Sequence, residues 1–452
     1  MRNCLWISIV FSLLYSVETT LGPSSRKSSV RTIEKVAPPA ARSIETPLLP
    51  TKPAPQESVE PTDTNVLQRD LIQEDLTAHS ILENHASYCS SCADTREFSY
   101  PTLIYITPWN NRGYDLIKMF PQKFDYVSPV WFSVKRTDTE KYLIHGTHDI
   151  DVQWIETIKQ KRPDIRFVPR VAVEHWSQND LEALIHSEAE KREFGLTLKN
   201  LLLEYDHLFD GYVLELLAQF HRASKTDVHH ILVDIAAQIH DIDTNSSRKK
   251  ELILPVPPIE QYFNQEDLNI LSNYLDGFHI MTYDFPTKEP GPVAPIGKYF
   301  HQHNIRSIFC PFLFIEWIKE TMNRLQLPKS GNPPKLFLGI NFYGYRYDRI
   351  LPPPPQDRPQ YHNRHILARD YIDFLREYYK KVMIVFDRRA HEHITILYGK
   401  ATNQNEKSSP EVVIFYPSLK SIYDRLELAN KLEVGVGVWD GGQGFDYFFD
   451  LF

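Results

Sequence analysis

The sequence has few cysteines, no excess of positive charge and no long apolar run, and each of these absences excludes a class of protein. It contains only four cysteines in 452 residues, and its one CxxC pair, Cys89-Ser90-Ser91-Cys92, has no second pair to complete a zinc site. A formal net charge of -8 gives no broad basic surface, which argues against a nucleic-acid partner. No apolar stretch reaches the roughly 18 residues of a bilayer-spanning helix, so we expect no transmembrane segment.

Residues 1–22 have the pattern of a secretory signal peptide. Arg2 supplies a positive start, an almost continuous apolar run extends from Leu5 to Tyr15, and small and polar residues follow as far as Gly22. The alternative is an uncleaved membrane anchor, although the apolar run is short for that role. We therefore expect a protein that is secreted, or delivered to the lysosome, with no membrane insertion after signal cleavage.

The remaining cysteines and a glycosylation motif fit that route only in part. Without the signal, Cys89, Cys92 and Cys310 remain, which is an odd number. A disulfide within the CxxC pair, a free thiol and a pairing with Cys310 are all compatible with the sequence. The sequon at Asn245 lies in a polar stretch between a predicted helix and a predicted strand, so we expect a glycan there.

Composition divides the chain into a linker and one large domain. Residues 23–70 are rich in Pro, Ser, Thr, Lys and Glu and carry almost no aromatic residue, which predicts a disordered linker. From residue 71 to 452, short apolar runs alternate with longer amphipathic stretches, as in repeated β–α units. The predicted strands are Leu103–Thr107, Val127–Val134, Arg166–Val173, Phe209–Leu217, Leu252–Val256, Gly277–Tyr283, Leu336–Tyr343 and Val434–Trp439.

Helical patterns between these strands predict an α/β fold, a (β/α)8 TIM barrel with a parallel, closed sheet. The alternation of strand and helix patterns stops after the seventh strand, where a helix at Ile366–Tyr379 is followed by three strand-like runs ending at Tyr416. We expect a small antiparallel α+β insertion at about residues 352–417 between strands 7 and 8. The run Pro352–Pro355 would open it as an extended polyproline segment.

Aromatic and polar side chains gather where the predicted strands end, which is the edge at which such barrels carry their sites. Aromatic faces stack on pyranose rings while carboxylates and amides bind hydroxyls, so this mixture is typical of a carbohydrate cleft. For each tryptophan, the alternative is a core residue that caps the barrel. The predicted carbohydrate-binding residues are Trp109, Trp131, Glu174, Trp176, Glu215, Tyr283, Asp284, Asn341, Tyr343 and Trp439.

Several of these positions lie in motifs that resemble those of glycoside hydrolase family 18, in its chitinase-like branch. The stretch Phe209–Leu217 resembles the DGxDxDxE strand of the family, Met281–Asp284 resembles its MxYD element, and Trp439 falls where the family keeps a tryptophan at the floor of the cleft. The resemblance extends from about residue 71 to the C-terminus and implies a barrel that binds chitin-type oligosaccharides, in which Tyr283 and Asp284 address the N-acetyl group. Further matching motifs are His148-Asp149-Ile150-Asp151, Pro169-Arg170, Leu338–Gly344 and Gly442–Tyr447.

The chain departs from the family at the proton donor. Aligned from Asp210 and Gly211, Val213 and Glu215 take the second and third aspartate positions, and Leu217 takes that of the proton-donating glutamate. In the family that glutamate protonates the glycosidic oxygen, a contribution typically worth about 10²–10⁴-fold. Leucine has no proton to give, so the resemblance implies binding without hydrolysis and no catalytic residue.

Strand alternation places Val213, Glu215 and Leu217 on one face, pointing into the barrel with Leu217 uppermost and close to Tyr283. Glu215 then lies about 6–7 Å deeper than the donor position, at ~3.3 Å per residue. We interpret it as a buried carboxylate with hydrogen bonds inside the barrel. A sugar contact and a relocated catalytic acid are the alternatives.

These observations favour a secreted, lectin-like barrel that binds chitin-type or other N-acetylated oligosaccharides. One alternative is an interaction scaffold of the secretory and lysosomal pathway, whose partner would be a secretory or endocytic receptor protein. A weak glycosidase that uses Glu215 is another. No motif indicates a metal, nucleotide or flavin cofactor, because Gly441-Gly442-Gln443-Gly444 lacks the strand-to-helix context of a dinucleotide-binding loop.

Overall fold

The computed structural model describes most of the chain from residue 61 onward. The predicted signal at residues 1–22, Asn245, Cys310 and Pro352–Pro355 lie outside the described residues, so the predictions about them stay predictions. Within the described part, no helix combines the length and the apolarity needed to cross a membrane. The described ranges are 61–137, 141–242, 248–285, 289–296, 298–300, 314–327, 333–350, 360–399 and 410–452.

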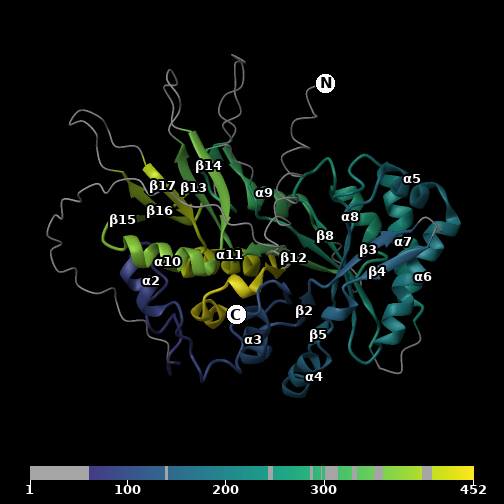
Figure 1. The fold of residues 1–452 in the computed structure, drawn as a ribbon, viewed down its shortest axis with the longest axis horizontal. Helices are drawn as coiled ribbons and strands as arrows, with labels where there is room; N and C mark the ends of the chain where they lie inside the picture. The colour runs from purple at the N-terminus through teal and green to yellow at the C-terminus, as the bar shows by residue number, and fades with distance from the viewer. Residues whose placement is uncertain are drawn as a thin grey trace, which may run out of the picture. The chain divides into compact units, whose positions relative to one another are not determined.

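The predicted barrel is present, and all of its strand pairs are parallel (Figure 1). Its second strand is divided into β2 and β3 by Val130-Trp131, and its third into β5 and β6 by Val168-Pro169. Because β1 pairs with both β18 and β2, β2 with β5, and β3 with β6, the ring of strands closes. The barrel strands are β1 Thr102–Ile106, β2 Tyr126–Pro129, β3 Phe132–Arg136, β5 Arg166–Phe167, β6 Arg170–Val173, β7 Gly211–Glu215, β8 Glu251–Val256, β9 Gly277–Ile280, β12 Lys335–Asn341 and β18 Gly435–Trp439.

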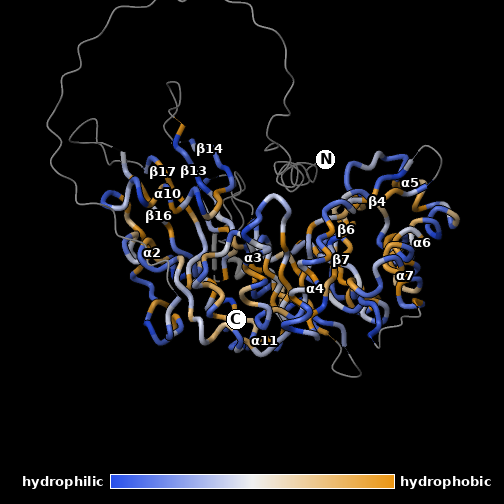
Figure 2. Tube along the Cα trace, turned by 60° about the horizontal axis from the view of Figure 1, so that its bottom comes forward, coloured by the Kyte–Doolittle hydropathy of each residue, from blue (hydrophilic) through white to orange (hydrophobic). Residues whose placement is uncertain are grey.

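Both faces of these strands are covered, which explains why they read as continuous apolar runs. β1 and β8 are buried along their whole length. On β7, Val213 belongs to the core inside the barrel, whereas the hydroxyl of Tyr212 donates to the carbonyl of Leu198 in a surrounding helix. Figure 2 shows apolar residues concentrated along the strands. Strand direction and side-chain alternation therefore fix which residues reach the inner face.

Most helices surround the barrel, whereas α2 and α10 lie beside the insertion sheet (Figure 1), and polar side chains cap several helices. Asp151 caps α4 by accepting from the backbone N–H of Trp154, and Ser177 and Asp180 form a capping box at the start of α5. The helical stretch after β6 is divided at Ser187, which ends α5 and caps α6. The helices are α2 Ala78–Asn84, α3 Arg112–Met119, α4 Val152–Lys161, α5 Gln178–His186, α6 Glu188–Glu204, α7 Lys225–His240, α8 Gln265–Leu271, α9 Trp317–Arg324, α10 Ala368–Tyr378 and α11 Leu419–Leu432, with short 3-10 turns η2 Pro121–Lys123, η3 Thr147–Asp149, η4 Gly441–Gln443 and η5 Asp446–Leu451.

The antiparallel insertion is present between strands 7 and 8, but it begins earlier than predicted. Its first hairpin follows directly after β12 and was missed, because its strands alternate polar and aromatic residues without an apolar run. The sheet has the order β14-β13-β17-β16-β15. Its strands are β13 Gly344–Ile350, β14 Gln360–Ile366, β15 Val382–Asp387, β16 Glu392–Tyr398 and β17 Pro410–Phe415; two further pairs of strands are β3 with β4 Tyr142–His145, and β10 Lys298–Phe300 with β11 Phe314–Glu316.

The segment before β1 is folded against the barrel, so the predicted end of the linker at residue 70 is too late. Val66 is fully buried, and the backbone N–H of Thr62 donates to the carbonyl of Tyr88. Cys89 and Cys92 form a disulfide, which decides between the alternatives that the sequence left open. The N–H of Cys89 also donates to the carboxylate of Asp450 near the C-terminus, at 2.9 Å.

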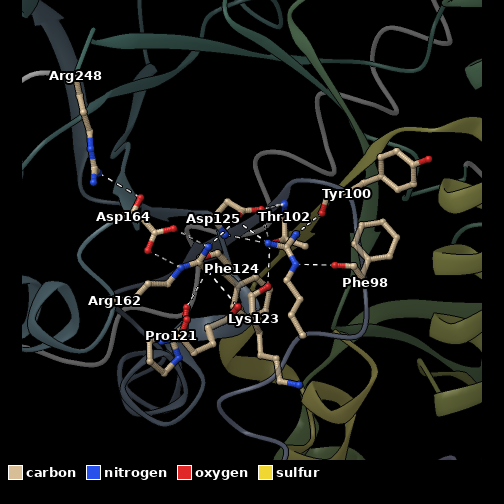
Figure 3. Close-up of polar contacts among 12 residues, drawn as sticks. Phe98, Tyr100, Thr102, Pro121, Lys123, Phe124, Asp125, Arg162, Asp164 and Arg248 are labelled. Atoms are coloured by element: carbon tan, nitrogen blue, oxygen red, sulfur yellow. Dashed lines mark hydrogen bonds and ion pairs between the residues drawn. The ribbon is translucent and has the colours of Figure 1, made fainter.

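A charged network joins the lower ends of the first strands (Figure 3). Asp125 pairs with Arg96 at 2.6 Å and with Arg162 at 2.7 Å. Arg162 also donates to the carbonyl oxygens of Pro121 and Phe124. These bonds lie at the amino ends of β1 and β2, opposite the edge where barrels carry their sites, so we assign them to stability.

Candidate functional site

The centre of the site is an ion pair between neighbouring strands. Arg170 of β6 donates from Nε to Glu215 of β7 at 2.6 Å and from a terminal nitrogen to Glu174 at 3.1 Å. Glu215 retains 14% of its side-chain exposure and Glu174 retains 38%. Burial opposes the charged form of Arg170, but the charges of Glu215 and Glu174 outweigh it and raise the pKa of the guanidinium. Glu215 is therefore a paired carboxylate, and Glu174 is the more open one.

Trp439, at the end of β18, lies above this ion pair. The guanidinium of Arg170 is 5.9 Å from the centre of the Trp439 ring, within the range of a cation–π contact. The ring also packs against Tyr105, with centroids 4.9 Å apart, and stays partly exposed. Trp439 thus joins the barrel core to a surface on which a sugar ring can stack.

A tyrosine–histidine pair lies beneath Trp439 in the barrel interior. The Tyr105 hydroxyl and His279 Nδ1 are 2.8 Å apart, and both residues are buried. A Cβ on Gly437 would come within 2.7 Å of His279 Nε2, so only glycine leaves room for this imidazole. Burial lowers the pKa of His279 to about 3, which keeps the ring neutral over the physiological range.

Asp284 links the barrel to the insertion. Its carboxylate accepts hydrogen bonds from the hydroxyls of Tyr343 and, at 3.1 Å, Tyr345. The His365 ring packs 4.5 Å from that of Tyr345. The pKa of Asp284 is raised, because the effect of burial exceeds the opposite effects of the Tyr343 hydrogen bond and the His365 ring. Tyr283, the preceding residue, is buried against Tyr343, with ring centroids 6.5 Å apart.

Two of the predicted sugar-stacking tryptophans are core residues instead. Trp131 donates from its indole to the Tyr114 hydroxyl at 2.7 Å and packs on Trp154. Trp176 donates to the carbonyl of Val134 at 2.7 Å and stacks on Tyr142. Their ring faces and N–H groups already have partners within the protein, which favours the alternative that both are core residues.

The other predicted residues fall at the rim or hold it together. Trp109 follows β1 and is 59% exposed, the largest exposure among the described large apolar side chains. Asn341, at the end of β12, is buried and donates to the carbonyl of Tyr343 at 2.7 Å. Asn341 therefore shapes the turn that carries Tyr343. The structure thus brings Glu174, Glu215, Tyr283, Asp284, Tyr343 and Trp439 to the upper ends of their strands.

The degenerate motif strand is shorter than predicted. Asp210 precedes it and accepts from the N–H of Phe167 at 3.0 Å, which is a structural role. Gly211 has φ 143°, and a Cβ there would lie 1.9 Å from the carbonyl oxygen of Glu251. The strand ends at Glu215, because the chain turns there and the N–H of Gln219 bonds to the carbonyl of Leu216. Leu217 is half-buried in that turn rather than on the strand.

Sequence reasoning missed several residues of the site. The sequence does contain an indication for Arg170, because its single charge interrupts an apolar run four residues before Glu174. His279 had a similar one within the sixth strand. Tyr345 and His365 had none, because the insertion sheet brings them to the barrel from distant positions. Within the described residues, no group of three or more His, Cys, Asp or Glu side chains is placed to bind a metal ion.

A cavity of about 120 Å³ lies elsewhere, between the loop after β8 and α9. It is too small for an oligosaccharide, since ligand pockets typically measure roughly 300–1,000 Å³. It is lined by Pro257, Pro258, Glu260, Phe263, Asn264, Gln265, Thr321, Arg324 and Leu325.

Comparisons with known proteins agree with the barrel fold. A chitinase from Chromobacterium violaceum ATCC 12472 is 16% identical over 78% of this chain and 98% of that chain, with a TM-score of 0.55. Human YKL-39 is 14% identical over the same shares, with a TM-score of 0.58, and a class V chitinase from Nicotiana tobaccum is 15% identical, again over 78% and 98%, with a TM-score of 0.56. At these identities the likeness concerns the fold. The sequence model of glycosyl hydrolases family 18 matches residues 102–443, from β1 to the turn after β18. The chain therefore belongs to this family.

Proposed function

We propose that this protein is a secreted chitinase-like lectin, which binds chitin-type or other N-acetylated oligosaccharides and does not hydrolyse them. The observation that carries the proposal is the Arg170–Glu215 ion pair beside a donor position occupied by Leu217. A general acid must bring its proton to about 2.6–3.2 Å from the leaving oxygen. Glu215 is already engaged at 2.6 Å with the guanidinium of Arg170, so its carboxylate is held within the barrel and is not placed to reach a leaving oxygen at the donor position.

The groups suited to sugar binding, in contrast, are retained. Trp439 offers a partly exposed ring for stacking, and Glu174 has 38% of its side chain open to hydroxyl groups. Tyr283 and Asp284 match the family element that addresses the N-acetyl group. Human YKL-39, which shares the fold, is described as a pseudo-chitinase with retained chitooligosaccharide binding properties. That combination of binding without turnover is what we propose for this chain, as an analogy between folds.

Calorimetry with N-acetylated chitotetraose, together with an assay for new reducing ends, tests the proposal. We expect saturable binding and no release of reducing ends above background, with an active chitinase as the positive control. Turnover abolished by Glu215→Gln would establish the glycosidase alternative. Absence of both binding and turnover would leave the scaffold alternative, with a secretory or endocytic receptor as partner. N-terminal sequencing of protein collected from the culture medium tests secretion and signal cleavage.

A further inference from the structure

We infer that Asp440 is a positioning residue for the sugar-binding surface, which locks the rim loop carrying Trp109 to the strand end carrying Trp439. The inference rests on the proposed function, because it explains how the two aromatic residues would be held for one ligand. We call residues 107–111, which follow β1 and contain Trp109, the rim loop. None of the family motifs in this sequence includes Asp440.

The contact itself is a buried hydrogen bond across the rim. Asp440 directly follows Trp439, is 6% exposed and accepts from the hydroxyl of Thr107 at 2.9 Å. Thr107 begins the rim loop, two residues before Trp109, and is itself buried. The backbone of Asp440 is left-handed, with φ 56°, a conformation that Asp and Asn tolerate better than other residues with side chains. Position 440 therefore favours a short carboxylate, both of whose oxygens can accept hydrogen bonds.

The turn after Asp440 packs against the same loop. A Cβ on Gly442 would lie 2.4 Å from Asn110 Nδ2, so the loop and the turn approach as closely as glycine allows. The turn also connects to the insertion: Gln443 Oε1 accepts from the N–H of Ala368, and its carbonyl accepts from Tyr416 at 2.7 Å. Asp440 thus lies where the rim loop, β18 and the insertion meet.

The acidity of Asp440 gives a readout that a purely steric role would not have. Burial raises the pKa of the Asp440 carboxyl group to about 6, although the hydrogen bond from Thr107 acts to lower it. Protonation removes one acceptor oxygen, so the lock should weaken as the pH falls through this value. The other titratable groups facing this turn are Tyr416, whose pKa burial raises well above 10, and Asp446, which is paired with Arg112 at 2.5 Å.

The test compares Asp440→Asn and Thr107→Val with a matched control, Asp450→Asn. Asp450 is also buried with a pKa raised by burial to about 6, but it bonds to Cys89 beside the N-terminal segment, away from the rim. We expect Asp440→Asn to bind chitotetraose about fivefold more weakly at pH 7.5, the worth of one hydrogen bond, and to lose the weakening below pH 6 that the native protein shows. Asp450→Asn should keep the native affinity and pH profile.

Amide hydrogen exchange in residues 107–114 provides a readout without ligand. Asp440→Asn and Thr107→Val should each accelerate exchange there about fivefold, and the double variant should add little, whereas Asp450→Asn should leave it unchanged. Native affinity together with native exchange in Asp440→Asn would overturn the inference. If the native protein does not bind chitotetraose, the proposed function fails, and the exchange rates alone still decide whether Asp440 holds the loop.

Discussion

Arg170 and Glu215 face each other at 2.6 Å on neighbouring strands inside the barrel, beneath Trp439. Each residue satisfies the other's charge, and Glu174 shares the same guanidinium. The pair therefore occupies the place where a catalytic strand would present its acids to substrate. Under the proposed function, the pair supports the sugar-binding surface and takes no part in hydrolysis.

Removing one partner of the Arg170–Glu215 ion pair should destabilise the fold. We expect Arg170→Met to lower the free energy of unfolding by about 3–5 kcal/mol, because Glu215 would lose its cation in a largely buried setting. Urea unfolding monitored by circular dichroism measures the change. The double variant Arg170→Met/Glu215→Leu should recover at least half of the loss, and equal instability of both variants would show that packing, not charge, is responsible.

The role of Trp439 can be separated from the role of a core tryptophan. We expect Trp439→Ala to weaken chitotetraose binding by about 1–3 kcal/mol, the worth of a stacked aromatic residue, while the barrel stays folded. Trp131→Phe is the control, since Trp131 is buried and bonded to Tyr114. It should lower stability by about 1 kcal/mol and leave affinity unchanged. Unchanged affinity in Trp439→Ala would instead assign Trp439 to the core.

Restoring the missing acid should not restore an efficient enzyme. Leu217→Glu places a carboxyl group at the position of the family's proton donor, but Val213 and Glu215 still replace the two aspartates that would tune it. The residue also lies in a turn, past the end of β7. We expect at most weak release of reducing ends from chitotetraose. Hydrolysis at the rate of an active chitinase would contradict the view that the whole strand has diverged.

His279 should make the fold sensitive to acid. Its pKa is lowered to about 3 by burial, whereas an unfolded histidine titrates near 6.5, so the unfolded state binds more protons between these values. Stability from this group is complete above about pH 6.5 and falls as the pH decreases towards 3. Between pH 7 and 4.5 we expect native stability to fall by roughly 2–3 kcal/mol more than that of His279→Gln. Parallel urea curves for the two proteins would contradict this.

Truncation should locate the true start of the folded domain. Removal of residues 1–60 should leave the melting temperature unchanged, which limited proteolysis and calorimetry can check. Removal of residues 1–70 should cost about 2 kcal/mol, because it takes away the buried Val66 and its neighbouring hydrogen bonds. A protease-resistant segment upstream of residue 60 would show that the folded domain starts earlier still.

The order of the barrel strands and the position of the insertion followed from the sequence alone. Apolar runs separated by amphipathic stretches determine a parallel closed barrel, because strands covered on both faces need continuous apolar sequence. The rim positions of Glu215, Tyr283 and Trp439 followed from strand direction and side-chain alternation. The replacement of the donor by Leu217 was also visible without a structure, once the family motif had been aligned.

Only the tertiary structure decided what those residues touch. Trp131 and Trp109 both lie at strand ends in the sequence, yet one is buried under helices and the other is 59% exposed. The partner of Glu215 is Arg170, from a different strand, and Asp284 meets Tyr345 from the insertion. Periodicity specifies which face a side chain occupies, but charge pairing, packing and hydrogen bonding between distant segments depend on how the chain closes in space.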